Sequence, residues 1–130
     1  MQYNTPVETK LGCIRGRDAL FLRQVHFVNR TTTLILEGAI NTRLCSKFES
    51  TAEYDYRLRF INVLAMKMIE LDSWHCSSQS SFDEVVDSDW IRQLGGKVTN
   101  EDRHFVVQTY DDVFEVVCEH FDFEVMQSRS

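Results

Sequence analysis

The sequence predicts a mostly β fold, either an antiparallel sandwich or a partly open barrel, with one or two short helices. Two features of the chain support this prediction. Apolar and polar residues alternate with a period of two along several segments, and the alternating residues are largely β-branched or aromatic, as in half-buried strands. Clusters of Asn, Asp, Ser and Gly separate these segments. An α+β arrangement is the alternative.

The most informative segment runs from His104 to Val125. Residues 104–109 and 113–119 alternate in the way that strands with one buried face do. Asp111 and Asp112 lie between them, and aspartate side chains can bond the backbone just ahead and tolerate turn conformations. We therefore expect a hairpin with its turn at these two residues.

Residues 19–28 and 33–40 predict a second hairpin, with Asn29-Arg30-Thr31 as its turn. Gly38, inside the second of these strands, indicates a bulge or a close backbone approach. Residues 54–60 alternate most regularly, with an aromatic and apolar face opposite a charged one, which is typical of an antiparallel sheet with one wet face. Residues 82–86 are a further candidate strand, and residues 11–17 are consistent with a strand or an extended segment.

Three segments need separate treatment. Residues 41–51 are polar and irregular, and we expect a loop that Leu44, Cys45 and Phe48 anchor to the core. Val63–Trp74 suits either a helix or a strand, and the weak break after the preceding strand slightly favours a strand. Residues 87–89 (Asp-Ser-Asp) precede apolar residues and then two glycines, which predicts a capped helix of one or two turns.

Length and composition indicate one domain, residues 1–130. No apolar run approaches the roughly 18 residues that span a bilayer, and the opening residues lack the order of a signal peptide. We therefore expect a cytoplasmic protein. The four cysteines are widely spaced, with no CxxC pair, which favours reduced, buried thiols over disulfides or metal ligands.

The formal net charge of −6 is concentrated towards the end of the chain, where residues 101–130 carry eight Asp and Glu against two Arg. Nucleic acids and anionic membranes require clustered cations, so both are disfavoured as partners. A basic protein surface is the complementary partner. An available sheet edge would also allow pairing into a homodimer.

No motif for catalysis or for metal or cofactor binding stands out. The chain contains no phosphate-binding glycine pattern and no nucleophile elbow. His75 beside Cys76, and His104 facing Cys118 across the hairpin, come nearest to a metal or nucleophile pair, but adjacent residues rarely act together in this way. We expect no catalytic residue, no metal site and no cofactor, and we lean towards a protein that is not an enzyme.

Most aromatic residues follow the strand alternation and are expected in the core. Three of them instead lie near the ends of loops, among acidic residues, and aromatic anchors carry much of the energy of protein interfaces. The candidate binding residues are therefore Trp74, Trp90, Tyr110, Asp111, Asp112 and Glu115.

Residues 60–74, 80–94 and 104–124 (FINVLAMKMIELDSW, SSFDEVVDSDWIRQL and HFVVQTYDDVFEVVCEHFDFE) resemble small bacterial single-domain proteins with a similar strand-rich ending. Some families of this appearance are similar to immunity proteins, which bind and block a toxin domain. The resemblance implies a bacterial protein with a binding role, and it assigns no function to any residue.

Two hypotheses follow. The first is a non-enzymatic binding module whose acidic and aromatic surface engages a basic protein. The second is a small-ligand-binding or enzymatic domain with a pocket at the loop ends, using Asp111, His75 or His104 with nearby aromatic residues. An exposed acidic patch supports the first, and a concave pocket lined by those residues supports the second.

Overall fold

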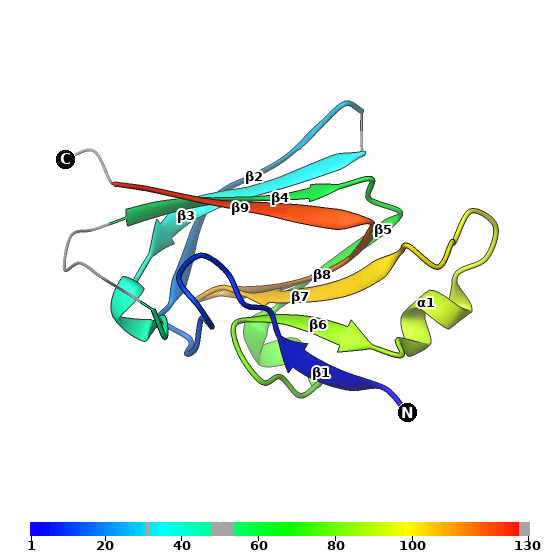
Figure 1. Ribbon diagram of the computed structural model, residues 1–130, viewed down its shortest axis with the longest axis horizontal. Coiled ribbons are helices and arrows are strands. Elements are labelled where there is room, and N and C mark those ends of the chain that lie inside the picture. Colours follow the sequence, from blue (N-terminus) through cyan, green and yellow to red (C-terminus); the bar gives the residue numbers. More distant parts are fainter. Residues whose placement is uncertain (31, 48–53, 128–130) are drawn as a thin grey trace.

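Two antiparallel β-sheets pack face to face (Figure 1). The computed structural model describes residues 1–30, 32–47 and 54–127. One sheet has five strands in the order β1-β6-β7-β8-β5, which span Tyr3–Pro6, Phe82–Val86, Arg103–Gln108, Asp112–Cys118 and Ala65–Glu70. The other has four strands in the order β2-β3-β4-β9, which span Leu20–Val28, Thr33–Ile40, Tyr54–Ile61 and His120–Gln127.

Short helical segments connect some of the strands: η1 (Thr42–Leu44), η2 (Leu71–Ser73) and α1 (Asp89–Gln93). The architecture confirms the predicted all-β sandwich with short helices, and the described strands do not close into a barrel. No helix in the described part of the chain has the length and apolar character of a membrane span.

The two sheets meet at a corner, where two strands pass from one sheet into the other. β4 leads into β5 through Asn62, whose φ is 60°, and β8 leads into β9 through Glu119. Backbone hydrogen bonds continue across the corner, from Glu119 N to Ile61 O (3.2 Å) and from Leu64 N to Val117 O (2.8 Å). The pairing of β4 with β9 therefore continues as the pairing of β5 with β8, which is how bent strands switch sheets.

The core lies between the sheets and is rich in aromatic rings. Phe60 and Phe121 from the four-stranded sheet meet Phe82 and Phe105 from the five-stranded sheet, with neighbouring ring centroids 5.1–6.2 Å apart and mostly tilted or edge-on. Such geometries suit the ring quadrupoles. The apolar face of β4 points into this core, as its alternation predicts.

The predicted hairpins are confirmed. The β7–β8 turn closes with a hydrogen bond from Thr109 N to Asp112 O (2.8 Å). In the β2–β3 turn, Asn29 and Arg30 have φ values of 53° and 67°, whereas Thr31 lies outside the described residues. Gly38 lies opposite the bulge of β2, which falls between Leu22 and Gln24. A Cβ at this position would lie 1.7 Å from Phe21 O, so the close backbone approach requires glycine.

The less certain segments are also explained. Val63–Trp74 contains strand β5 followed by η2, as the slight preference for a strand predicted. The helix α1 begins as predicted, with Ser88 Oγ accepting a hydrogen bond from Ile91 N (3.1 Å). Leu44 and Cys45 pack against the core, and Phe48 and residues 49–51 lie outside the described part of the chain.

Two features differ from expectation. The sequence does not indicate strand β1, because it is short, polar and ends in Pro6, which an edge strand tolerates. Strands β7 and β8 were expected to have one wet face, but both of their faces are buried. Residues 71–81 and α1 cover the outer face of the five-stranded sheet, and Leu71 and Trp74 pack there against an apolar cluster that contains Val106.

Candidate functional site

Four side chains form a continuous series of hydrogen bonds on the covered face of the five-stranded sheet. His104 is at the centre, with Nδ1 2.7 Å from Ser88 Oγ and Nε2 2.7 Å from Glu115 Oε1. Trp74 Nε1 donates to Glu115 Oε2 at 3.1 Å. The side chains of His104 and Glu115 are only 4% and 8% exposed. We call these four residues the His104 network.

Local structure explains why these residues meet. His104 on β7 and Glu115 on β8 are diagonal neighbours on the same face of paired strands, which is within reach of two long side chains. Ser88 approaches as the N-cap of α1, and Trp74 follows the last residue of η2. The network therefore connects two strands with both segments that cover them.

The charge of Glu115 is stabilised in this interior position. Burial raises the pKa of the Glu115 carboxyl, but hydrogen bonds from His104 and Trp74 and the charge of Lys67 outweigh it and hold the pKa below its usual value. Trp90 contacts His104 edge-on, with ring centroids 5.3 Å apart. Lys67 Nζ lies 4.1 Å from the centroid of the Trp90 ring, which is a cation–π contact.

The His104 network contains the residue types of a hydrolytic triad but not its arrangement. In such triads Nε2 of the histidine takes the serine proton and Nδ1 donates to the carboxylate. Here Ser88 lies on Nδ1 and Glu115 on Nε2, and Ser88 Oγ also accepts the helix-capping bond from Ile91 N. Because Ser88 and His104 are both buried and Ser88 Oγ is also the cap of α1, we interpret the network as a structural linkage between α1, β7 and β8.

A second cluster lies where β5 and β8 meet η2. Glu70 and Asp112 are directly opposite each other on the paired strands. Leu71 N donates to Asp111 O at 2.8 Å and so ties η2 to the β7–β8 turn, and Asp72 is the next residue of η2. We call the four carboxylates of Glu70, Asp72, Asp111 and Asp112 the acidic end.

Tyr110 stands beside the acidic end with its side chain partly in solvent, since the residue is 40% exposed. Its ring stacks on Phe21, with centroids 5.4 Å apart and an interplanar angle of 20°. The guanidinium carbon of Arg17 lies 4.8 Å from the centroid of the Tyr110 ring. An exposed aromatic ring is thus held in one position by its neighbours.

The structure divides the six candidate binding residues between these two places. Trp74 and Glu115 belong to the His104 network and Trp90 packs beside it, whereas Tyr110, Asp111 and Asp112 lie at or beside the acidic end. Glu115 is buried rather than part of the acidic surface on which the sequence placed it.

Sequence reasoning placed His104 opposite Cys118 across the hairpin, but Cys118 is opposite Arg103, and the partner that the reasoning missed is Glu115. The strand alternation carried a signal for it, because it assigns both residues to faces that do not point into the main core. The reasoning also missed Glu70 and Asp72. Their position depends on β5 pairing with β8, which the sequence does not show.

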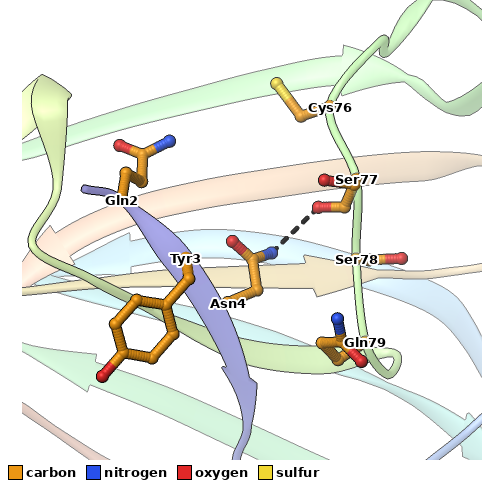
Figure 2. Close-up of a pocket in the computed structure, with 7 residues that line it drawn as sticks. All are labelled: Gln2, Tyr3, Asn4, Cys76, Ser77, Ser78 and Gln79. Atoms are coloured by element: carbon orange, nitrogen blue, oxygen red, sulfur yellow. Dashed lines mark hydrogen bonds between the residues drawn. The ribbon is translucent and has the colours of Figure 1, made fainter.

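A cavity of about 230 Å³ lies between β1 and the loop that precedes β6 (Figure 2). Gln2, Tyr3 and Asn4 line one side and residues 76–79 line the other, and Asn4 Nδ2 donates to Ser77 O at 2.9 Å. The lining of this cavity contains no Asp, Glu, Lys, Arg or His. The cavity offers amides and hydroxyls for hydrogen bonding, together with the exposed thiol of Cys76.

The four cysteines are free, but only Cys45 and Cys118 are buried, while Cys13 is half-buried and Cys76 is exposed. Burial raises the pKa of the Cys45 thiol to about 11 and that of Cys118 to about 12, so both remain protonated at neutral pH.

Within residues 1–30, 32–47 and 54–127, no three His, Cys, Asp or Glu side chains are placed to share a metal ion. Comparison with known protein families, with curated proteins and with solved structures finds no match for this chain.

Proposed function

We propose that this protein is a binding module that uses the acidic end, with Tyr110 beside it, to engage a basic surface of a protein partner. The observation that carries the proposal is the direct opposition of Glu70 and Asp112 on paired strands, with Asp72 and Asp111 on the adjoining segments. Like charges in opposed positions destabilise a sheet. A partner that supplies cations would pair with these carboxylates, and that of Glu70 is already oriented by hydrogen bonds from Asp72 N (2.8 Å) and Ser73 Oγ (3.2 Å).

The surroundings of the acidic end suit a protein interface. Tyr110 is stacked on Phe21, so the ring would lose little conformational freedom on binding. Met68 on β5 is 56% exposed and adds apolar surface two residues before Glu70. Aromatic and methionine side chains are enriched at protein interfaces.

The alternative of a ligand site at the loop ends has less support. The cavities described here are not lined by His75, Asp111 or Tyr110. Both ring nitrogens of His104 are bonded within the fold. An immunity protein of bacterial origin, whose partner is a toxin domain, is the specific form of binding module that the sequence resemblance favours.

The test compares two charge reversals of equal size. The protein is immobilised, proteins from its source cells are captured, and any protein retained is purified so that its affinity can be measured at several salt concentrations. Asp111→Lys places a cation in the acidic end. Glu101→Lys makes the same charge change in the turn before β7 and is the control.

We expect a basic partner that binds the unmodified protein and the Glu101→Lys control, binds Asp111→Lys at least tenfold more weakly, and loses affinity as salt rises. Tyr110→Ala should also weaken it, because the ring would act as an anchor. The proposal fails if the retained protein binds Asp111→Lys as tightly as the control, or if no retained protein depends on the acidic end.

A further inference from the structure

A second cavity, of about 220 Å³, has a basic lining, unlike the cavity between β1 and residues 76–79. Residues 15–17 form one side, residues 78–81 form another, and Gln108 on β7 completes the lining. Its lining contains two arginines and no carboxylate, although the chain as a whole has a net charge of −6. The carboxylate of Asp83 is buried behind the wall, where it accepts hydrogen bonds from Gln79 N and Ser80 Oγ, both at 2.6 Å. Ser78 and Gln79, which are labelled in Figure 2, line this cavity as well as the neutral one.

Hydrogen bonds hold the walls of this cavity together. Ser81 N donates to Ile14 O at 2.7 Å, and Ser81 Oγ donates to Gly16 O at 2.8 Å. Gln108 Nε2 donates to Ser80 O at 3.2 Å. The φ of Gly16 is +102°, which side chains rarely permit, so glycine allows the chain to turn between the two arginines. The cavity is therefore part of the folded structure without a ligand.

The two guanidinium groups are positioned without being neutralised. Arg15 Nη1 donates to Gln79 O at 3.1 Å, and Arg17 Nε donates to Tyr110 O at 3.0 Å. Each bond uses one of the five N–H groups of an arginine. Neither residue takes part in an ion pair with the described residues, unlike Arg23, Arg57, Arg59, Arg92 and Arg103.

We propose that this cavity binds a phosphoryl group, either free phosphate or the phosphate of a small phosphomonoester. Arginine offers paired N–H groups that match two phosphate oxygens, and its charge is unaffected by pH in the ordinary range. The hydroxyl of Ser78 adds a neutral donor at the same wall. Drug-sized ligands occupy pockets of roughly 300–1,000 Å³, so this smaller cavity suits a single phosphoryl group with little attached.

This site adjoins the proposed protein-binding surface through Arg17, but Arg15 lies on the side of the cavity away from that contact. Arg15 contacts neither Tyr110 nor the four carboxylates of the acidic end, so a change at Arg15 tests the cavity alone. Arg17 does contact Tyr110 and is left unchanged for that reason.

The experiment titrates the full chain with inorganic phosphate, with phosphoserine and with serine, using calorimetry and the arginine Nε–H signals in NMR spectra. Arg15→Gln removes one guanidinium, and Ser78→Asp places a carboxylate on the cavity wall while keeping both arginines. Arg43→Gln makes the same charge change as Arg15→Gln at an exposed arginine outside the cavity, and it serves as the control.

We expect saturable phosphate binding below about 10 mM, with shifts of the Arg15 and Arg17 signals and no response to serine. Tighter binding of phosphoserine than of phosphate identifies a phosphomonoester as the ligand, and the reverse identifies free phosphate. Arg15→Gln and Ser78→Asp should each weaken binding at least about tenfold, and Arg43→Gln should leave it unchanged.

Several outcomes would overturn the proposal. The proposal is overturned if neither inorganic phosphate nor phosphoserine binds saturably. It is also overturned if Ser78→Asp binds as tightly as the unmodified protein, or if Arg43→Gln weakens binding as much as Arg15→Gln does. Circular dichroism checks that each variant is folded. If Arg15→Gln does not fold, Ser78→Asp decides the question alone, since retained binding refutes the site and lost binding supports it.

Discussion

Removing the carboxylate of Glu115 should destabilise the protein strongly. In Glu115→Ala, the indole N–H of Trp74 and the ring N–H of His104 lose their acceptor in a buried position. An unsatisfied buried donor costs about 1–3 kcal/mol, so two of them cost about 2–6 kcal/mol. Small domains have a free energy of unfolding of roughly 5–15 kcal/mol. The variant would therefore lose a large part of its stability.

Glu115→Gln is the matched comparison, because an amide can satisfy the same neighbours. Its oxygen can accept from Trp74, and its N–H can donate to His104 Nε2 once the imidazole proton moves to Nδ1 and donates to Ser88. The Ser88 hydroxyl then loses its acceptor on Nδ1, so we expect this variant to lose about 1–3 kcal/mol, less than Glu115→Ala, in which two donors lose their acceptor. Because both variants lack the charge, the difference between them reports the lost hydrogen bonds together with the lost side-chain packing.

Urea unfolding followed by fluorescence and circular dichroism measures both free energies. The structural interpretation of the His104 network is refuted if Glu115→Ala unfolds within about 1 kcal/mol of the unmodified protein. It is also refuted if Glu115→Gln is as unstable as Glu115→Ala.

Further predictions concern acid stability, backbone packing and thiol reactivity. The pKa of the Glu115 carboxyl is lower in the folded protein than in the unfolded chain, where it is about 4.3. The stability that this carboxylate contributes is therefore present above the unfolded pKa and is lost as pH falls through the folded pKa. In urea titrations, Glu115→Gln should accordingly lose less stability on acidification than the unmodified protein. Gly38→Ala forces a Cβ against a backbone oxygen and should lower the free energy of unfolding by about 3 kcal/mol or more. Gly95→Ala is the control, because Gly95 has open space around it, and its free energy of unfolding should stay within about 0.5 kcal/mol of that of the unmodified protein. Equal stability of the two variants would contradict the close approach at the bulge. Cys76 should react with a thiol reagent in the folded protein and the two buried cysteines only on unfolding, so that Cys76→Ser, but no change at a buried position, removes an early reaction.

Local patterns in the sequence were sufficient for most of the strands. The alternation of residues 54–60, the Asn29-Arg30 turn and the Ser88 cap each depend on neighbours within a few residues, and all three match the structure. Strand β1 depends on a distant pairing with β6 and has no alternation of its own, so the sequence alone does not reveal it. Fold class therefore follows from local physics, and strand order does not.

The candidate site was harder to predict because it depends on which segments cover which sheet face. Glu115 reads as a solvent-facing residue of an alternating strand, and only the passage of Trp74 and α1 over that face makes it interior. Arg15 and Arg17 form a cavity with residues 78–81, more than sixty positions later in the chain. The spacing of residues in the sequence predicts neither arrangement.

The corner between the sheets sets a limit on how this chain can vary in length. β8 and β9 are separated only by Glu119, and β4 and β5 only by residues 62–64. The alternation of inward-facing and outward-facing side chains therefore has to be correct in both sheets across each of these short connections. One inserted residue at Glu119 would exchange the faces of β9, turning Phe121 and Phe123 towards solvent and Asp122 and Glu124 towards the core. Homologues should therefore differ in length at the turns after β2 and α1, and hardly at all at this corner.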